Sequence, residues 1–197
     1  MRLFGKFIQV VTLSACFAPW VLTPAVASSE DVSVAGLRVD TTSHDIYVSF
    51  EVKGAFTEEI RERIDSGLPV TFQYDMEVSR RRAFWFDKTL VRKKITTTVS
   101  YDTLTRQYSL SKKMNGEVAE TSVAVNDPDM MRWMTHLDRI RLGDPTALGA
   151  IGKDSLYVRV KSRLQRKFLF FFIPSSLETG WEKIGLSLPV EGMGRAR

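Results

Sequence analysis

Alternation of apolar and polar side chains constrains the fold of this chain more than any other feature. From Val70 to Val78 every second residue is apolar, and the residues between them are polar or charged. A period of two is typical of a β-strand that buries one face. The same pattern recurs at residues 46–53, 95–101 and 156–164, so we expect strands along most of the chain.

Two segments change to helical spacing. One begins after Thr57 and ends at Gly67, where a glycine allows the helix to stop. The other begins at Asp127 and keeps helical spacing of apolar residues through Ile140 to Gly143. Antiparallel-style strands with two helices between them point to an antiparallel sheet, a sandwich or an open barrel. We therefore expect a mainly β, β-rich α+β fold with two short helices.

Aromatic side chains on these elements indicate a shared core. Phe72 and Tyr74 lie on the apolar face of the alternating strand, and Trp133 lies on the second predicted helix. Large aromatic residues in separate elements are typical of one core that all the elements cover. We expect all three side chains to be buried.

The first 27 residues have the layout of an export signal. Arg2 and Lys6 precede an uncharged, mostly apolar stretch at 7–22, and residues 25–27 supply the small side chains that a signal peptidase accepts. Cleavage after position 27 leaves residues 28–197 as a single β-rich envelope domain. The expected location is therefore periplasmic or secreted.

Cys16 suggests an alternative cellular location. It ends a Leu-Ser-Ala-Cys sequence that has the form of a lipoprotein processing box, and cleavage before it would leave the chain lipid-anchored through Cys16. Cys16 is also the only cysteine. Cleavage after position 27 would leave the mature domain without a disulfide, a thiol nucleophile or a cysteine-bound metal.

Residues that could carry catalysis do not form a recognisable site. His44 and His136 lie in different predicted elements, without a second ligand at metal spacing. Asp75 and Glu77 share a strand face and could act as an acid and base pair, but a polar outer face explains them more simply. We expect no enzyme activity, no cofactor and no metal.

A run of basic residues forms the candidate interaction surface. Its members are Arg80, Arg81, Arg82, Arg92, Lys93 and Lys94. Trp85 and Phe86 lie between them, and cations interleaved with aromatic rings can bind anionic lipid heads or nucleic acid. Charges at strand ends and aromatic residues in the core explain the run better. Loss of Arg2 and Lys6 lowers the formal charge from +5 to +3, so no nucleic acid is expected.

The stretch from Phe168 to Ile173 is continuously apolar and too short to span a bilayer. A buried segment accounts for it. If the stretch is exposed, it would contact a membrane or a partner instead.

Four short motifs follow one another along the chain. They are Ser66-Gly67-Leu68-Pro69-Val70-Thr71-Phe72, Trp85-Phe86-Asp87, Tyr101-Asp102-Thr103-Leu104-Thr105-Arg106-Gln107-Tyr108 and Tyr157-Val158-Arg159-Val160. In this order they resemble an uncharacterised family of exported proteobacterial proteins, domain of unknown function 4390. The resemblance covers nearly all of the expected mature chain. It implies an envelope protein encoded near a membrane sensor histidine kinase, and it supplies no catalytic residue.

These observations favour an exported periplasmic interaction or binding domain that is accessory to an envelope sensor kinase. Its expected partner is an envelope protein or a membrane sensor, and the signal segment could also contact a membrane. One alternative is a carrier of lipid or another apolar ligand, suggested by the apolar stretch near the C-terminus. The weakest alternative is a hydrolase that uses Asp75 and Glu77.

Overall fold

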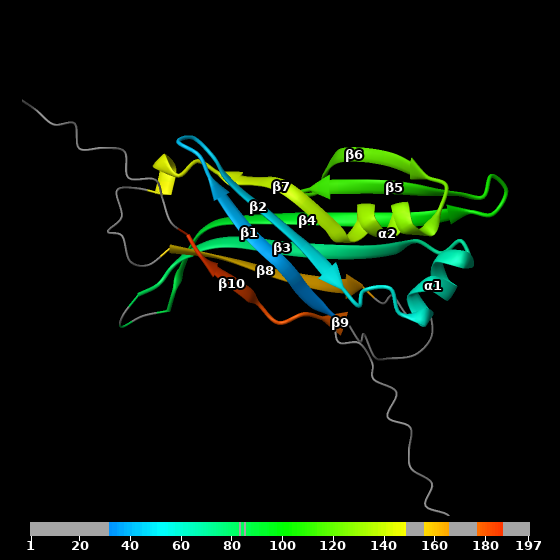
Figure 1. The fold of residues 1–197 in the computed structure, drawn as a ribbon, viewed down its shortest axis with the longest axis horizontal. Coiled ribbons are helices and arrows are strands. Elements are labelled where there is room, and N and C mark those ends of the chain that lie inside the picture. The colour runs from blue at the N-terminus through cyan, green and yellow to red at the C-terminus, as the bar shows by residue number, and fades with distance from the viewer. Residues whose placement is uncertain (1–31, 83, 85, 149–155, 166–176, 187–197) are drawn as a thin grey trace, which may run out of the picture.

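A computed structural model of the chain describes residues 32–82, 84, 86–148, 156–165 and 177–186. Within these ranges the chain forms two antiparallel β-sheets and two α-helices (Figure 1). In chain order the elements are β1 (Ser33–Thr41), β2 (Ile46–Lys53), α1 (Glu58–Asp65), β3 (Val70–Arg80), β4 (Lys88–Asp102), β5 (Gln107–Met114), β6 (Glu117–Ala124), α2 (Asp127–Thr135), β7 (His136–Gly143), the 3₁₀ turn η1 (Thr146–Leu148), β8 (Leu156–Gln165), β9 (Leu177–Glu178) and β10 (Glu182–Gly185). The expected β-rich α+β fold is confirmed.

Three sequence predictions fall outside the described residues: the export signal, the lipidation of Cys16 and the burial of the stretch from Phe168 to Ile173. Among the helices that the structure describes, none is long and apolar enough to span a bilayer.

The two sheets pack against each other. The smaller sheet has the strand order β1-β2-β7, and it crosses over the larger sheet, whose order is β10-β8-β3-β4-β5-β6 with β9 paired to β8 (Figure 1). Every pairing is antiparallel. β3 is the central strand of the larger sheet, because it pairs with β4 on one side and β8 on the other along nearly its whole length.

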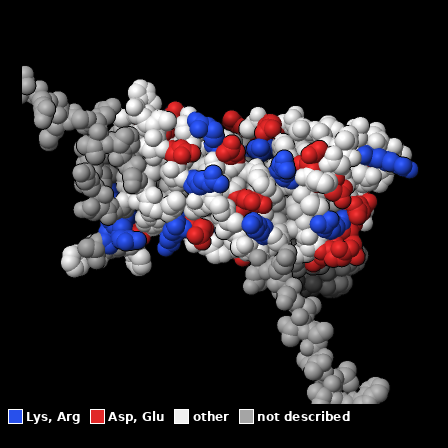
Figure 2. All heavy atoms as spheres, in the orientation of Figure 1, with Lys and Arg blue, Asp and Glu red and all other residues white. Residues whose placement is uncertain are grey.

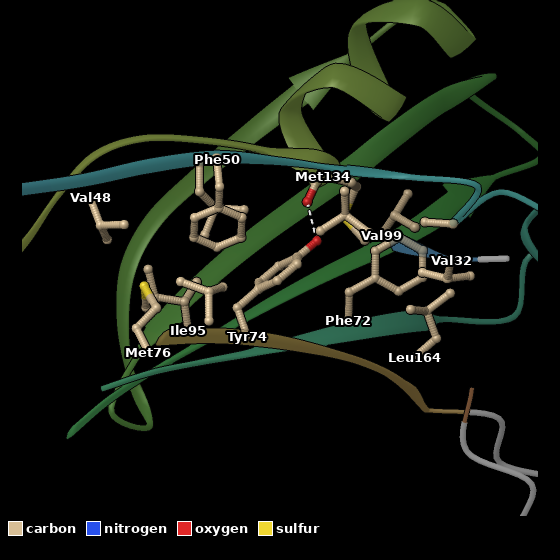
Figure 3. Close-up of a cluster of buried hydrophobic side chains, with 14 of the residues drawn as sticks. Val32, Val48, Phe50, Phe72, Tyr74, Met76, Ile95, Val99, Met134 and Leu164 are labelled. Carbon is tan, nitrogen blue, oxygen red and sulfur yellow. Dashed lines mark hydrogen bonds between the residues drawn. The ribbon is translucent and has the colours of Figure 1, made fainter. Parts of the chain in front are cut away.

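The core lies between the sheets and is built from alternate residues of both. Phe72, Tyr74 and Met76 of β3 are fully buried, and β2 places Val48 and Phe50 above them (Figure 3). The rings of Phe50 and Tyr74 meet edge to face, with centroids 5.8 Å apart. The expected burial of Phe72 and Tyr74 is therefore confirmed.

The first helix lies where the sequence predicts it. Glu58 and Glu59 occupy the first turn of α1, where the helix dipole favours acidic side chains. Ile60 and Ile64 face the core. The chain leaves the helix at Gly67, whose φ of 74° is readily adopted only by glycine.

The second helix is shorter than predicted, because a strand replaces its second half. α2 ends at Thr135, and residues 136–143 form β7, which pairs with β2. A bulge explains the misleading pattern: Arg139 has a φ of 47°, and the register against β2 shifts there. Leu137 and Ile140 consequently reach the same side of the strand although they are spaced as on a helix.

Trp133 is only partly buried, so the prediction that it belongs to the core is wrong. It packs on the edge of the core from the exposed side of α2. Its Nε1 donates to Glu120 Oε1 at 3.2 Å, and Lys112 Nζ lies 4.5 Å from the ring centroid. A tryptophan has a polar N–H that needs a partner, and here a surface carboxylate of β6 supplies it.

The Tyr74 hydroxyl is a buried polar group that joins the two layers. It donates to the Met134 carbonyl oxygen at 2.6 Å, in the last turn of α2 (Figure 3). Burial raises the pKa of Tyr74, so the hydroxyl keeps its proton.

Tyr74→Phe is expected to lower the free energy of unfolding by about 1–2 kcal/mol, because the Met134 carbonyl loses its short bond inside the core. Urea denaturation measures the loss. Tyr47→Phe is the control, because Tyr47 bonds Asp45 at 3.2 Å in a partly exposed site. Equal losses in the two variants would contradict this account of the buried hydroxyl.

Candidate functional site

Charged side chains cover the outer face of the larger sheet, which points away from the smaller sheet. On β3, Asp75 and Glu77 alternate with the core residues. The residues opposite these two acids are Lys94 and Arg92 on β4 and Lys161 and Arg159 on β8. Cross-strand pairs of opposite charge stabilise a sheet. The basic residues of β4 and β8 at these positions are thus matched by acids on the central strand.

Glu77 is enclosed by two arginines. Its side chain is 4% exposed and accepts hydrogen bonds from Arg92 Nε at 2.7 Å and from Arg159 Nε at 2.7 Å. Burial opposes ionisation of the carboxyl, but the hydrogen bonds and charges of Arg159 and Arg92 outweigh it, so the pKa of Glu77 is lowered. Glu77 therefore remains ionised at neutral pH.

Asp75, the other member of the suggested acid and base pair, is held by polar neighbours. Gln73 Nε2 donates to Asp75 Oδ2 at 3.1 Å, and Arg163 Nη1 lies 3.8 Å from the same oxygen. A general acid at neutral pH needs a carboxyl with a raised pKa, whereas the shift at Glu77 has the opposite sign. The geometry gives the hydrolase alternative no support.

The charged face continues to the end of the sheet where β3 turns into β4. Trp181, which precedes β10, stacks on Arg159 with the guanidinium carbon 4.5 Å from the ring centroid. Tyr157 at the start of β8 donates its hydroxyl to Asp87 Oδ2 at 2.6 Å. Lys183 of β10 lies over the Tyr157 ring. These contacts connect β8 and β10 to the base of the β3–β4 hairpin.

This hairpin lies at one end of the elongated body (Figure 1), and the connection between its strands contains two phenylalanines. Phe84 is 93% exposed and Phe86 is 95% exposed. The interpretation of the aromatic residues in this run as core residues is wrong for Phe86, and Trp85 lies outside the described residues. A sequence signal for exposure was present: the strict alternation ends at Val78 and resumes only at Ile95, so these rings lie outside both amphipathic segments.

The six basic residues of the predicted interaction surface do not form one patch. They are Arg80, Arg81 and Arg82 at the hairpin, Arg92 and Lys94 on the outer face of the sheet, and Lys93 on the opposite face. Burial, followed by the charge of Arg141, lowers the pKa of Lys93 on that opposite face. The structure therefore places Arg81 and Arg82 beside the exposed rings and turns Lys93 away from them.

Charge is unevenly distributed along the long axis of the molecule. Basic side chains gather around the hairpin, at the lower left of Figure 2, and acidic side chains gather over α1 at the other end. The hairpin contributes Arg81, Arg82 and Lys88, all exposed. The acidic residues of α1 are Glu58, Glu59, Glu62 and Asp65. The domain thus has a basic end that carries exposed aromatic rings and an acidic end without them in its described residues.

The two histidines belong to the smaller sheet and to one of its turns. His44 is exposed in the turn between β1 and β2, and His136 Nε2 lies 3.6 Å from Glu51 Oε2 on β2. Among the described residues, no three histidine, cysteine or acidic side chains are grouped so that they could hold a metal ion.

Comparison with known proteins finds one relationship. No curated protein and no solved structure matches the chain. A family model matches residues 29–179, which is more than half of the chain and includes the elements from β1 to β8, among them the β3–β4 hairpin. The chain therefore belongs to the family described as a domain of unknown function, DUF4390.

Proposed function

We propose that this chain is an exported interaction domain of the bacterial cell envelope, which acts by binding and uses the β3–β4 hairpin as its contact element. A membrane sensor kinase, the neighbour that the family resemblance implies, is one system in which such a domain would serve. The observation that carries the proposal is the nearly complete exposure of both Phe84 and Phe86 in the connection between β3 and β4.

Two phenylalanine rings exposed to water in one short connection are energetically unfavourable unless a binding partner covers them. Single exposed apolar residues are common on protein surfaces, but clustered ones mark contact sites. Covering a phenylalanine side chain completely contributes about 1.5–3 kcal/mol, so two rings can supply much of a modest binding energy. The charged residues at the hairpin base keep this tip soluble in the absence of a partner.

The base of the hairpin is held by strand pairing and by hydrogen bonds. The hairpin continues β3, which is paired on both sides, and Asp87 fixes its base by accepting hydrogen bonds from the Tyr157 hydroxyl at 2.6 Å and the Arg82 backbone N–H at 3.3 Å. The bond from Tyr157, followed by smaller contributions that include Arg81 and Lys183, lowers the pKa of Asp87. A fixed base lowers the conformational entropy that a contact element loses on binding, which favours affinity.

The carrier alternative receives less support. A lipid carrier needs an apolar cavity. In the described part of the chain, the space between the sheets is occupied by interlocking core side chains such as Phe50, Phe72 and Tyr74.

Photo-crosslinking in the native bacterium tests the proposal. A benzophenone amino acid replaces Phe84 in the full chain, and a matched chain carries it at Leu104, which is 92% exposed in the turn between β4 and β5. The chain is expected in the fraction outside the cytoplasm, with adducts to an envelope component from position 84 and not from position 104. Equal adducts from both positions, or a chain retained in the cytoplasm, would contradict the proposal.

A further inference from the structure

The hairpin that carries Phe84 and Phe86 is also strongly basic. Residues 80–88 contain four basic side chains and a single acid, Asp87. Asp87 is engaged at the base by Tyr157 and by the Arg82 backbone. The cations nearest the tip remain available, since Arg81, Arg82 and Lys88 are exposed and form no salt bridge with another described residue.

The small exposed apolar content of this element favours a membrane surface over a second protein. A stable protein interface covers about 800 Å² on each partner, whereas the described residues of this tip offer two exposed apolar side chains. A bilayer interface accepts such a tip, because aromatic rings enter the headgroup region while arginine and lysine reach phosphates with their long side chains. Aromatic and basic residues together are therefore the combination that an anionic lipid surface selects.

The distribution of charge over the whole domain agrees with this orientation. The acidic residues of α1 lie at the opposite end of the long axis from the hairpin (Figures 1 and 2). An anionic surface attracts the basic end and repels the acidic end, so the domain would approach the bilayer hairpin first.

We infer that the β3–β4 hairpin docks the domain on an anionic lipid bilayer, with Phe84 and Phe86 among the headgroups and Arg81, Arg82 and Lys88 on lipid phosphates. This inference deepens the proposed function, on which it rests, by naming the partner of the same contact element. A protein partner at the tip is the competing outcome.

Vesicle flotation tests the inference with the full chain as purified from exporting cells. Vesicles contain either phosphatidylcholine alone or equal parts of phosphatidylcholine and phosphatidylglycerol. Each basic residue near an anionic surface raises the binding affinity roughly five-fold. With three such residues we expect the chain to bind phosphatidylglycerol vesicles more than about ten-fold more tightly than phosphatidylcholine vesicles. Added salt is expected to weaken this preference by screening.

Variants at the tip separate the apolar from the electrostatic contribution. Phe84→Ser with Phe86→Ser is expected to reduce binding by about ten-fold or more, because the buried ring area is lost. Arg81→Gln with Arg82→Gln is expected to reduce binding to phosphatidylglycerol vesicles by about ten-fold or more and to leave binding to phosphatidylcholine unchanged. Leu104→Ser, which alters an equally exposed apolar residue elsewhere, is expected to bind like the wild type.

The outcomes distinguish this inference from the proposed function. Equal binding of the wild type to both vesicles, no binding to either, or an equal loss in Leu104→Ser would overturn membrane docking. If docking fails while position 84 still forms specific adducts with an envelope protein in cells, the proposed function stands with a protein as the partner. Failure of both experiments removes the hairpin as a contact element.

Discussion

Phe72→Ala is expected to lower the free energy of unfolding by about 3–5 kcal/mol, the largest loss among the substitutions considered for this domain. Phe72 is fully buried at the centre of the larger sheet. Its ring meets Phe56 edge to face with centroids 5.3 Å apart, and Leu164 of β8 lies opposite it in the register. Alanine would remove the ring from between the two sheets, where the neighbouring strands are too constrained to close the cavity.

Trp133→Ala is the matched control for Phe72→Ala. It removes a larger aromatic side chain, but one that is partly exposed and whose N–H bonds the surface carboxylate of Glu120. We expect a loss of about 1–2 kcal/mol, within the usual range for a partly buried residue. Urea denaturation of both variants measures the difference. A loss at Trp133 as large as that at Phe72 would mean that α2 contributes far more to the core than the geometry indicates.

The sequence predicted the strands well where the pattern is local. The apolar face of β3, including Phe72 and Tyr74, follows directly from a period of two, because successive side chains of a strand point to opposite faces of the sheet. β7 was not predicted, because the sequence pattern extended the second helix over its residues. Its bulge at Arg139 places Leu137 and Ile140 on one side at a spacing that also fits a helix, and only the pairing of β7 with β2 distinguishes the two structures.

The candidate site was harder to predict, because its parts are distant in sequence. Glu77 and Arg159 are 82 positions apart, and their contact depends on the register of β3 against β8. Alternation identifies which face a residue occupies and leaves its neighbour across the sheet undefined. The exposed rings were missed for another reason: aromatic residues beside strands are usually buried, and Phe86 lies in the turn.

The charged outer face and the hairpin are physically connected. β3 carries Glu77 three residues before it ends at Arg80, where the chain passes into the hairpin. Arg159, which binds Glu77, also stacks on Trp181 beside β10, and Tyr157 on the same strand holds Asp87. The arrangement of ion pairs therefore stiffens the strands from which the tip projects, so that stability of this face and presentation of the tip should change together.

Glu77→Gln is accordingly expected to lower the free energy of unfolding at neutral pH by about 2–4 kcal/mol, because it breaks an enclosed charge cluster and leaves Arg159 without its carboxylate. Arg92 is 69% exposed and can return to water, which keeps the loss below that of a fully buried pair. Denaturation at neutral pH measures this loss.

The dependence on pH identifies the ionised carboxylate as the cause. The pKa of Glu77 is lower in the folded chain than its ordinary value of 4.5, so the unfolded chain binds more protons in the acid range. The stabilisation is complete above that ordinary value and is lost as the pH falls through the folded pKa. Wild-type stability should therefore fall more steeply below about pH 5 than that of Glu77→Gln, and the two curves should approach each other in acid.

Asp75→Asn is the control on the same strand face. Asp75 lies 3.8 Å from Arg163, whose side chain is considerably exposed, so we expect a loss below about 1 kcal/mol. Other acids of the folded chain also have lowered pKa values, namely Asp87, Asp102, Glu120 and Asp144. They make the stability of every variant fall in acid, so only the difference between wild type and Glu77→Gln is diagnostic. Parallel curves for these two proteins would show that packing of the side chain, and not its charge, explains any loss at Glu77.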